Sequence, residues 1–417
     1  YVPSSHATRN RVPLPAAARP LAEAEVEYKE HVSQSVYVKF PLVGHPNTFI
    51  LIWTTTPWTL PANLAVAYNA SFYYSLVQVG DEAYIVSNQL LSSVSEKARW
   101  EGYEIIRTLD ADHLKQIEYH HPFCQRTGRL LPGEFVENTT GTGFVHIAPG
   151  HGMDDYHLGL QNGLPIYSPV DDDGALAYTS DLPREQQMPA EMAGKSILEK
   201  HGKSDANEAV LHELRVRKAL LHQENYHHSY PHCWRSKTPV IFRAMDQWFI
   251  RIDHQGFRGQ AMAAIDRVAW VPDWGKNRIE GAVKSRPDWC ISRQRTWGVP
   301  IPAFYSAEGE AMLDGRIVRN TAALFEKHGS NVWFEKSAPE LWSLVKPADW
   351  TGPEAVSKSM DTLDVWIDSG SSSRAVLARR PELQHGGSAP ADPKNTAQWQ
   401  ADVYLEGSDQ HRGWFQS

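Results

Sequence analysis

The sequence predicts a mixed fold, α/β combined with α+β, and the first observation behind this prediction is the β-rich half before residue 226. An apolar run of β-forming residues at 48–52 predicts a buried strand. The segments 73–79 and 83–87, separated by a Gly-Asp pair, predict a hairpin, and 142–147 predicts a further strand. This half is therefore expected to be mostly strands with short helices.

The second observation is the alternation of helix and strand patterns after residue 226. Helical patterns cover 256–267 and 275–285, 403–405 predicts a strand, and 361–370 predicts a strand that leads to a Ser/Gly turn. Alternation of this kind is typical of α/β architecture. In the first half, an acidic cluster at 205–208 predicts a capping box that opens a helix to about residue 221.

The amino-acid composition limits the classes of protein to which this chain can belong. A chain of 417 residues can bury the cores of two or more domains. The net charge of −8 gives no overall basic field for nucleic acid, so such a role needs local patches such as Arg286, Arg293 and Arg295. The 3 cysteines are few and odd in number, which favours a reducing compartment. No apolar stretch reaches the length of a membrane span, and no signal peptide is evident.

Segments rich in Pro, Gly, Ala or polar residues predict where the chain is irregular. Residues 1–20 are rich in Pro, Ala and Arg without periodicity and predict a flexible lead-in. Residues 381–399 are polar and broken by Pro and Gly, which predicts a linker or surface loop. The sequence stops directly after a dense motif, so we expect a fragment of a longer protein.

The first candidate site follows the apolar strand at 53–61 (WTTTPWTLP). Three hydroxyls at a strand end can each donate and accept a hydrogen bond, which suits a small polar pocket. Pro57 and Pro61 stop a regular helix there and remove backbone donors. Threonine as an ordinary β-branched strand residue is the alternative interpretation, which the prolines and flanking tryptophans disfavour.

The second candidate site is the run at 141–156 (GTGFVHIAPGHGMDDY). A metal site could use His146, His151 and Asp155, although this spacing is not that of two ligands on one helical face. Capping of a helix N-terminus is the structural interpretation for Asp154 and Asp155, and it suits one of the two. The other carboxylate would then be available to a pocket.

Both runs resemble the editing domain of isoleucyl-tRNA synthetases. The first is similar to its threonine-rich strand and the second to the strand and turn across the pocket. The resemblance implies that Asp155 holds the α-ammonium group of a misacylated amino acid and that His146 excludes the larger correct one. It assigns substrate and water contacts, and the pocket wall, to these residues: Thr54, Thr55, Thr56, Trp58 and Asn63.

Four later runs resemble the same family: 230–239, 286–300, 361–370 and 404–415. They are similar to the return from the editing domain and to signatures of the class I catalytic domain. The resemblance implies that the aminoacyl-adenylate and the isoleucine side chain are held by the matching residues, which are Trp366, Glu406, Gly407, Asp409, Gln410 and Trp414. The implied architecture is a β-rich editing domain at 21–225, inserted into a Rossmann-like catalytic domain of which only the second half, 226–417, is present.

The chain also departs from the family pattern. The His-x-Gly-His element is absent, and the segment 356–360 only superficially resembles the Lys-Met-Ser-Lys-Ser loop, because it precedes the 404–415 run. Ser236 stands where a second zinc ligand beside Cys233 would be needed, so no metal is expected. We therefore expect hydrolytic editing without a cofactor, and no synthesis by this chain alone.

The expected function is that of a bacterial-type isoleucyl-tRNA synthetase, with hydrolysis of misacylated valyl-tRNA(Ile) carried by this chain. The resemblance implies tRNA(Ile), isoleucine, valine and ATP as ligands, with ATP and Mg²⁺ needed by the full-length enzyme. We expect a cytoplasmic monomer without a membrane partner. Two alternatives stay open, namely a non-catalytic tRNA-binding module and a metal-dependent hydrolase that uses His146, His151 and Asp155.

Overall fold

A computed structural model describes residues 7–16, 26–199, 203–295, 297–385 and 400–413. The chain divides into two compact units, one of residues 11–245 and one of residues 1–10 with 246–417. Strand β12 (Ile241–Ile250) runs through this division. In the part of the chain that the structure describes, no helix combines the length and apolar character that a membrane span needs. The assignment of 21–225 and 226–417 to separate functional domains stays a prediction.

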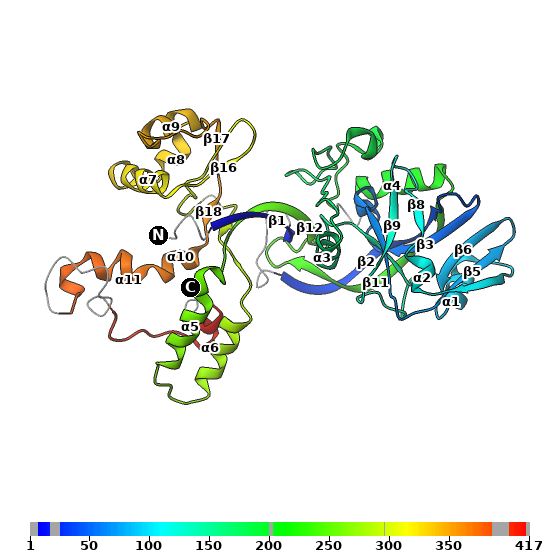
Figure 1. Ribbon diagram of the computed structural model, residues 1–417, viewed down its shortest axis with the longest axis horizontal. Coiled ribbons are helices and arrows are strands. Elements are labelled where there is room, and N and C mark those ends of the chain that lie inside the picture. The colour runs from blue at the N-terminus through cyan, green and yellow to red at the C-terminus, as the bar shows by residue number, and fades with distance from the viewer. Residues whose placement is uncertain (1–6, 17–25, 200–202, 296, 386–399, 414–417) are drawn as a thin grey trace. The chain divides into compact units, whose positions relative to one another are not determined.

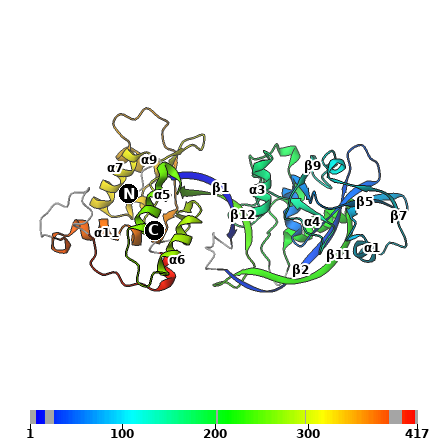
Figure 2. The ribbon, with the colours of Figure 1, turned by 60° about the horizontal axis from the view of Figure 1, so that its bottom comes forward.

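The unit of residues 11–245 is built on two mixed sheets. The larger has the strand order β11-β2-β3-β6-β5-β7 and the smaller has the order β10-β4-β9-β8. Their strands are β2 (Val26–Pro41), β3 (Thr48–Thr54), β4 (Ala65–Tyr68), β5 (Tyr74–Val79), β6 (Glu82–Ser87), β7 (Glu104–Leu109), β8 (Glu118–His120), β9 (Thr127–Pro132), β10 (Phe144–Ile147) and β11 (Leu220–Cys233). Helices α1 (Leu91–Ala98), α2 (Ala111–Leu114), α3 (Met153–Gln161) and α4 (Asp205–Val216) complete it. Figures 1 and 2 show β2 and β11 as two long strands running side by side, and they pair antiparallel from Val38 opposite Leu220 to Val26 opposite Cys233.

The predicted strands of this unit are confirmed. The side chains of Ile50, Leu51 and Ile52 in β3 are fully buried, because Ile50 and Ile52 pack into one apolar core and Leu51 packs into another. Its pairing is antiparallel to β2 and parallel to β6. The predicted hairpin is β5 and β6, whose turn uses Gly80 at φ 57, a conformation that suits glycine. The predicted strand at 142–147 is β10.

Helix α4 differs from its prediction at both ends. Its N-cap is Ser204, whose Oγ accepts a hydrogen bond from the Asn207 backbone N–H at 3.3 Å, so Asp205 already lies inside the helix. The helix ends at Val216 rather than near 221. Lys218 adopts a left-handed conformation (φ 55), which breaks the helix and turns the chain into β11.

The lead-in prediction for residues 1–20 is wrong for residues 7–16. These residues form β1 (Ala7–Ala16), which neighbours β12 in a three-stranded sheet with β13 (Trp289–Cys290). A partner strand more than two hundred residues away in the sequence supplies the pairing, so no local pattern predicts it. Residues 1–6 and 17–20 lie outside the described residues. The same holds for 386–399 of the loop predicted at 381–399, whose first residues form a short 3-10 turn, Pro381–Leu383.

The unit that contains residues 246–417 is richer in helices. The two predicted helices are confirmed as α5 (Phe257–Asp266) and α6 (Gly275–Lys284), which lie side by side (Figure 1) and share a small apolar core with Ile265, Ile279 and Val283. A second core, centred on Phe304 and Trp333, joins three helices to a small sheet. Its elements are α7 (Gly315–His328), α8 (Val332–Glu335), α9 (Ala338–Val345), β15 (Phe304–Tyr305), β16 (Ala311–Met312) and β17 (Ser357–Lys358).

Two strand predictions in this unit are wrong. The structure has no strand at 403–405, which leads irregularly into a 3-10 turn, Ser408–Arg412. The run at 361–370 is strand only at β18 (Thr362–Leu363), which pairs with β14 (Ser292–Arg293), and then becomes α10 (Val365–Gly370). Asp364 ends the strand by capping this helix, since its carboxylate accepts a hydrogen bond from Trp366 N–H at 3.0 Å. A further helix, α11 (Ser372–Ala375), follows.

In the described part of this unit, four strand pairs give no sign of a doubly wound parallel sheet. The pairs β12–β13, β14–β18, β15–β16 and β15–β17 are all antiparallel. The coarser prediction of mixed sheets with helices, compatible with an α/β fold, is confirmed for the described chain. A Rossmann-like half stays a prediction.

Candidate active site

The threonine run lies where β3 ends and the chain turns. Thr54 is buried, and its Oγ1 accepts a hydrogen bond from Thr56 N–H at 3.1 Å. The chain then enters a 3-10 turn, Pro57–Ala62, with proline at its first position, where no backbone N–H is needed. The hydroxyl of Thr54 therefore shapes the turn, while Thr55 and Thr56 come next in the chain with partly exposed side chains.

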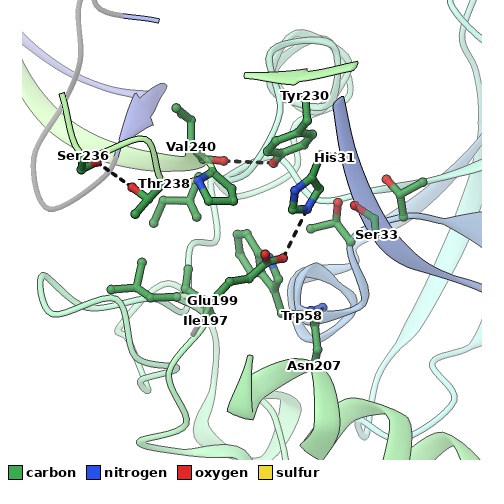
Figure 3. A pocket seen from close by; sticks show the side chains of 15 residues that line it. His31, Ser33, Trp58, Ile197, Glu199, Asn207, Tyr230, Ser236, Thr238 and Val240 are labelled. Atoms are coloured by element: carbon green, nitrogen blue, oxygen red, sulfur yellow. Dashed lines mark hydrogen bonds and ion pairs between the residues drawn. The ribbon is translucent and has the colours of Figure 1, made fainter. Parts of the chain in front are cut away.

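A cavity of about 360 Å³ begins at this turn, and Thr55, Thr56 and Trp58 line one side of it. The remaining polar lining comes from β2, β11 and the segments that follow β11 and precede α4 (Figure 3). These polar residues are His31, Ser33, Glu199, Tyr230, Ser236 and Thr238, and Asn207 in the first turn of α4 completes the polar lining. A volume of this size suits a small ligand or one end of a larger one.

The polar residues that line the cavity opposite the threonine run contact one another, as Figure 3 shows. The His31 ring points toward Glu199, with 3.6 Å between Nε2 and the carboxylate. The Tyr230 hydroxyl donates to the Val240 carbonyl at 3.0 Å, and the hydroxyls of Ser236 and Thr238 lie 2.7 Å apart. Sequence reasoning missed His31 and Glu199, because only the β2–β11 pairing brings residue 31 close to residue 230.

Asn207 fixes the turn from a third direction. Its side-chain oxygen accepts a hydrogen bond from Trp58 N–H at 2.9 Å, so the first turn of α4 is tied to the threonine run. The pattern at 205–208 indicated a capping box, whereas the structure places Asn207 in the lining of the cavity. The local pattern identifies Asn207 only as part of a helix start, and its hydrogen bond with Trp58 arises from the tertiary fold.

The second predicted segment lies directly behind this turn. His146, at the end of β10, has its Nε2 3.0 Å from the Thr59 hydroxyl. The His151 ring packs edge-on against Trp58, with 5.0 Å between ring centroids, and its Nδ1 lies 2.9 Å from the Phe242 carbonyl oxygen. The fold thus brings together the two segments that the sequence singled out. His146 and His151 stand behind the cavity lining rather than in it.

His146 is a neutral imidazole at physiological pH. Burial, followed by the nearby His151 ring, lowers the pKa of His146 to about 4. A neutral ring has one N–H donor and one acceptor nitrogen, so His146 can take part in hydrogen bonds without carrying a charge.

Asp155 lies in the first turn of α3, whose N-cap is Gly152 in an extended conformation. The capping interpretation is therefore wrong for both carboxylates, since Asp154 and Asp155 follow the cap residue. Burial, reinforced by Asp154, raises the pKa of Asp155 to about 8, although a backbone hydrogen bond at Ala148 acts in the opposite direction. Asp155 is not among the residues that line the cavity.

The raised pKa of Asp155 predicts that stability depends on pH. The folded chain keeps the proton up to about pH 8, whereas the unfolded chain loses it near the ordinary pKa of 3.8. The contribution of protonated Asp155 to stability is thus fully present below pH 3.8 and is lost as pH rises through the folded pKa. We expect Asp155→Asn to unfold at a higher temperature than the wild type at pH 8.5, by roughly a few degrees, with the gap closing as pH falls toward 4.

Thermal unfolding followed by circular dichroism at several pH values measures this gap. Asp172→Asn is the control, because Asp172 is an exposed carboxylate, 90% accessible, in an ion pair with Arg243. A melting temperature of Asp155→Asn that lies at or below the wild-type value at pH 8.5 would contradict the assignment of the raised pKa.

Asn63 is not among the residues that line this cavity, and its assignment to the pocket wall stays a prediction. Only 1% of it is exposed, and its amide is used in packing. Its Nδ2 donates to the Ala65 carbonyl at 2.8 Å, and its Oδ1 accepts from the Tyr119 hydroxyl at 2.7 Å. Its role in this structure is to hold the turn after Pro61 to the smaller sheet.

The Asn63–Tyr119 bond gives a test of that structural role. Tyr119→Phe should lower the free energy of unfolding by about 1–3 kcal/mol, because a buried amide oxygen loses its donor. Urea unfolding measures this effect, with Tyr73→Phe as the control because Tyr73 is 64% exposed. Equal stability of the two variants would contradict the role assigned to this bond.

The residues predicted to hold an adenylate lie on or near the 3-10 turn at 408–412. Glu406, Gly407 and Asp409 are exposed, and Gln410 donates to the Asp409 carboxylate at 3.0 Å. The Trp366 ring lies against Gly413, so it is close to the same turn. Trp414 lies outside the described residues. The structure therefore gathers five of these six residues in one region of the unit.

The segment 356–360 has a structural role in this unit. Lys358 donates from its Nζ to the backbone carbonyls of Trp333 and Lys336, and Ser359 is buried. These contacts tie β17 to α8. The interpretation of the segment as only superficially similar to the Lys-Met-Ser-Lys-Ser loop is consistent with this packing.

The described residues contain no group of three or more His, Cys, Asp or Glu side chains arranged to hold a metal ion. The metal-hydrolase alternative therefore finds no support at His146, His151 and Asp155. Among the described residues, Cys124, Cys233 and Cys290 form no disulfide bond.

The sequence matches a known family over nearly its whole length. The family model described as tRNA synthetases class I (I, L, M and V) matches residues 12–417. This chain belongs to that class I family. The relationship predicted from the threonine and histidine segments is confirmed, because both lie within the match.

The curated relatives narrow the relationship within this class I family. The chain is 45% identical over 403 residues to an isoleucine--tRNA ligase of Syntrophomonas wolfei, covering 95% of this chain and 40% of the relative. It is 44% identical over 406 residues to that of Thermotoga maritima, covering 97% and 41%. It is 46% identical over 404 residues to that of Moorella thermoacetica, covering 95% and 40%. The chain thus spans about two fifths of the length of these relatives and is similar to isoleucyl enzymes.

Two solved structures overlap distantly with this chain. The structure titled GlLeuRS-CP1 overlaps with a TM-score of 0.34 at 16% identity, covering 45% of this chain and 97% of that chain. The editing domain of P. falciparum cytosolic leucyl-tRNA synthetase overlaps with a TM-score of 0.25 at 12% identity, covering 30% and 64%. Overlaps of this size carry no weight for fold or function.

Proposed function

We propose that this chain carries the editing site of an isoleucyl-tRNA synthetase and hydrolyses valyl-tRNA(Ile). The observation that carries the proposal is the meeting of the two predicted segments. The Thr59 hydroxyl lies between the carbonyl of cavity-lining Thr56, at 2.8 Å, and the ring of His146, at 3.0 Å. A site assembled from segments almost ninety residues apart, each resembling the same pocket, supports a joint role.

The chemistry required is modest. An aminoacyl ester is already activated, so hydrolysis needs an oriented water and stabilisation of the developing oxyanion rather than a strong nucleophile. Thr55 and Thr56 offer hydroxyls at the cavity, and the carboxylate of Asp155 would hold the α-ammonium group. Binding of that ammonium group favours the ionised carboxylate and would lower the raised pKa of Asp155.

A second, hydrolytic site corresponds to double-sieve editing, by which aminoacyl-tRNA synthetases for small apolar amino acids remove misacylated products. One methylene gives limited discrimination during synthesis, so a smaller pocket hydrolyses the smaller wrong product. Neutral His146 behind the turn would limit the length of the side chain that fits. Valine would then be accepted and isoleucine excluded.

Synthesis belongs to the full-length enzyme in this proposal. Glu406, Gly407, Asp409, Gln410 and Trp366 would hold the adenylate in a Rossmann-like catalytic domain, with ATP, Mg²⁺ and isoleucine as its ligands. Editing itself would need no cofactor. We propose a cytoplasmic protein whose macromolecular partner is tRNA(Ile).

The direct test compares two esters. Purified chain is incubated with valyl-tRNA(Ile) and with isoleucyl-tRNA(Ile), and release of the amino acid is followed with and without EDTA. The proposal expects faster release of valine and no effect of EDTA. Binding of tRNA without hydrolysis would favour the tRNA-binding module, and loss of activity in EDTA would favour the metal hydrolase.

A further inference from the structure

Thr59 makes two hydrogen bonds with a single hydroxyl. Only 6% of the residue is exposed, and its Oγ1 lies 2.8 Å from the Thr56 carbonyl oxygen and 3.0 Å from His146 Nε2. A carbonyl oxygen can only accept, so the hydroxyl proton goes to Thr56. The bond with His146 then requires that Nε2 carries a proton and donates to the hydroxyl oxygen.

This arrangement determines which nitrogen of His146 is the acceptor. Because burial keeps the ring neutral, a proton on Nε2 leaves Nδ1 with a lone pair. Within the described part of the chain, Nδ1 is buried and has no hydrogen-bond partner. Buried acceptors without a partner are costly and rare in proteins, and they call for an explanation.

We propose that Thr59 is a positioning residue that holds His146 as the neutral Nε2–H tautomer and so keeps Nδ1 ready to accept a hydrogen bond from a water molecule, or from a hydroxyl or ammonium group of the bound aminoacyl-tRNA. The inference rests on the proposed editing function and adds a residue to it. The other tautomer would present an N–H at Nδ1, which cannot accept from an N–H or O–H donor. Thr59 would thus act through His146, without touching the reacting atoms.

The tautomer of His146 can be measured by NMR, independently of hydrolytic activity. In ¹⁵N-histidine-labelled full-length chain at neutral pH, the signals of His146, assigned by their loss in His146→Gln, should show a protonated Nε2 and an unprotonated Nδ1. Thr59→Val, which keeps the shape and removes the hydroxyl, should shift both signals toward a mixture of tautomers. Thr59→Ser should retain the wild-type pattern. A protonated Nδ1 in the wild type, or an unchanged pattern in Thr59→Val, would overturn the proposal.

Kinetics test the role in editing. Hydrolysis of valyl-tRNA(Ile) should fall about tenfold in Thr59→Val, roughly the rate equivalent of one hydrogen bond, and recover in Thr59→Ser. Equal rates in the two variants would overturn the positioning role. A wild-type chain that shows the expected tautomer but hydrolyses no ester would instead reject the proposed function, so the two failures are distinguishable.

Discussion

Asp155→Ala is expected to slow the hydrolysis of valyl-tRNA(Ile) by roughly two to three orders of magnitude, because the α-ammonium group loses its charged partner. Asp155 is the partly buried carboxylate of the α3 first turn, and its raised pKa shows that its surroundings solvate a negative charge poorly. A bound ammonium group would supply the missing countercharge. Single-turnover hydrolysis of the purified chain at pH 8 measures the effect.

Asp154→Ala is the matched control for Asp155→Ala. Asp154 is exposed, lies one residue earlier in the same helix turn, and affects Asp155 only through its charge. Its removal should change the rate by less than about threefold, since exposed charges interact weakly. If Asp155→Ala hydrolyses the ester as fast as Asp154→Ala does, the role assigned to Asp155 is wrong.

Gly150→Ala is expected to have the second large effect, because the loop between β10 and α3 has no room for a side chain at residue 150. A Cβ on Gly150 would lie 2.3 Å from the backbone oxygen of Tyr167 and 2.7 Å from the Ser168 side chain. The Gly150 carbonyl also accepts a hydrogen bond from Ala244 N–H at 2.7 Å, so the loop is held on two sides. The substitution must therefore displace backbone.

The displaced segment carries His151 and leads into Asp155, so both stability and activity should fall. We expect a loss of about 1–3 kcal/mol in the free energy of unfolding, as for other overpacked sites. The rate should drop roughly a hundredfold, the usual cost of misplacing reacting groups by about an ångström. Urea unfolding and single-turnover hydrolysis measure the two effects.

Gly102→Ala is the control for this substitution. A methyl group on Gly102 would have no neighbouring atom within 4 Å, and the residue needs no positive φ, so alanine should be tolerated there. Wild-type activity in Gly150→Ala would show that the loop adjusts freely and would contradict its role in placing Asp155.

Local patterns predicted the parts of the molecule that local physics determines. The β3 strand, the β5–β6 hairpin and helices α5 and α6 follow from apolar periodicity and turn residues. The same reasoning failed at 403–405, where a short apolar run is exposed, and at 361–370, where the capping carboxylate of Asp364 starts a helix. Short runs carry too little pattern to separate strand from helix or coil.

The sequence by itself determined the chemistry of the candidate site, because residue types and their spacing at 53–61 and 141–156 are local properties of the chain. Only the tertiary structure decided which of those residues line the cavity. The β2–β11 register brings His31 to Tyr230, and packing of the smaller sheet buries Asn63 away from the cavity. The pKa values of His146 and Asp155 likewise depend on burial. Burial and long-range contact are set by the packing of distant segments, which no single stretch of sequence contains.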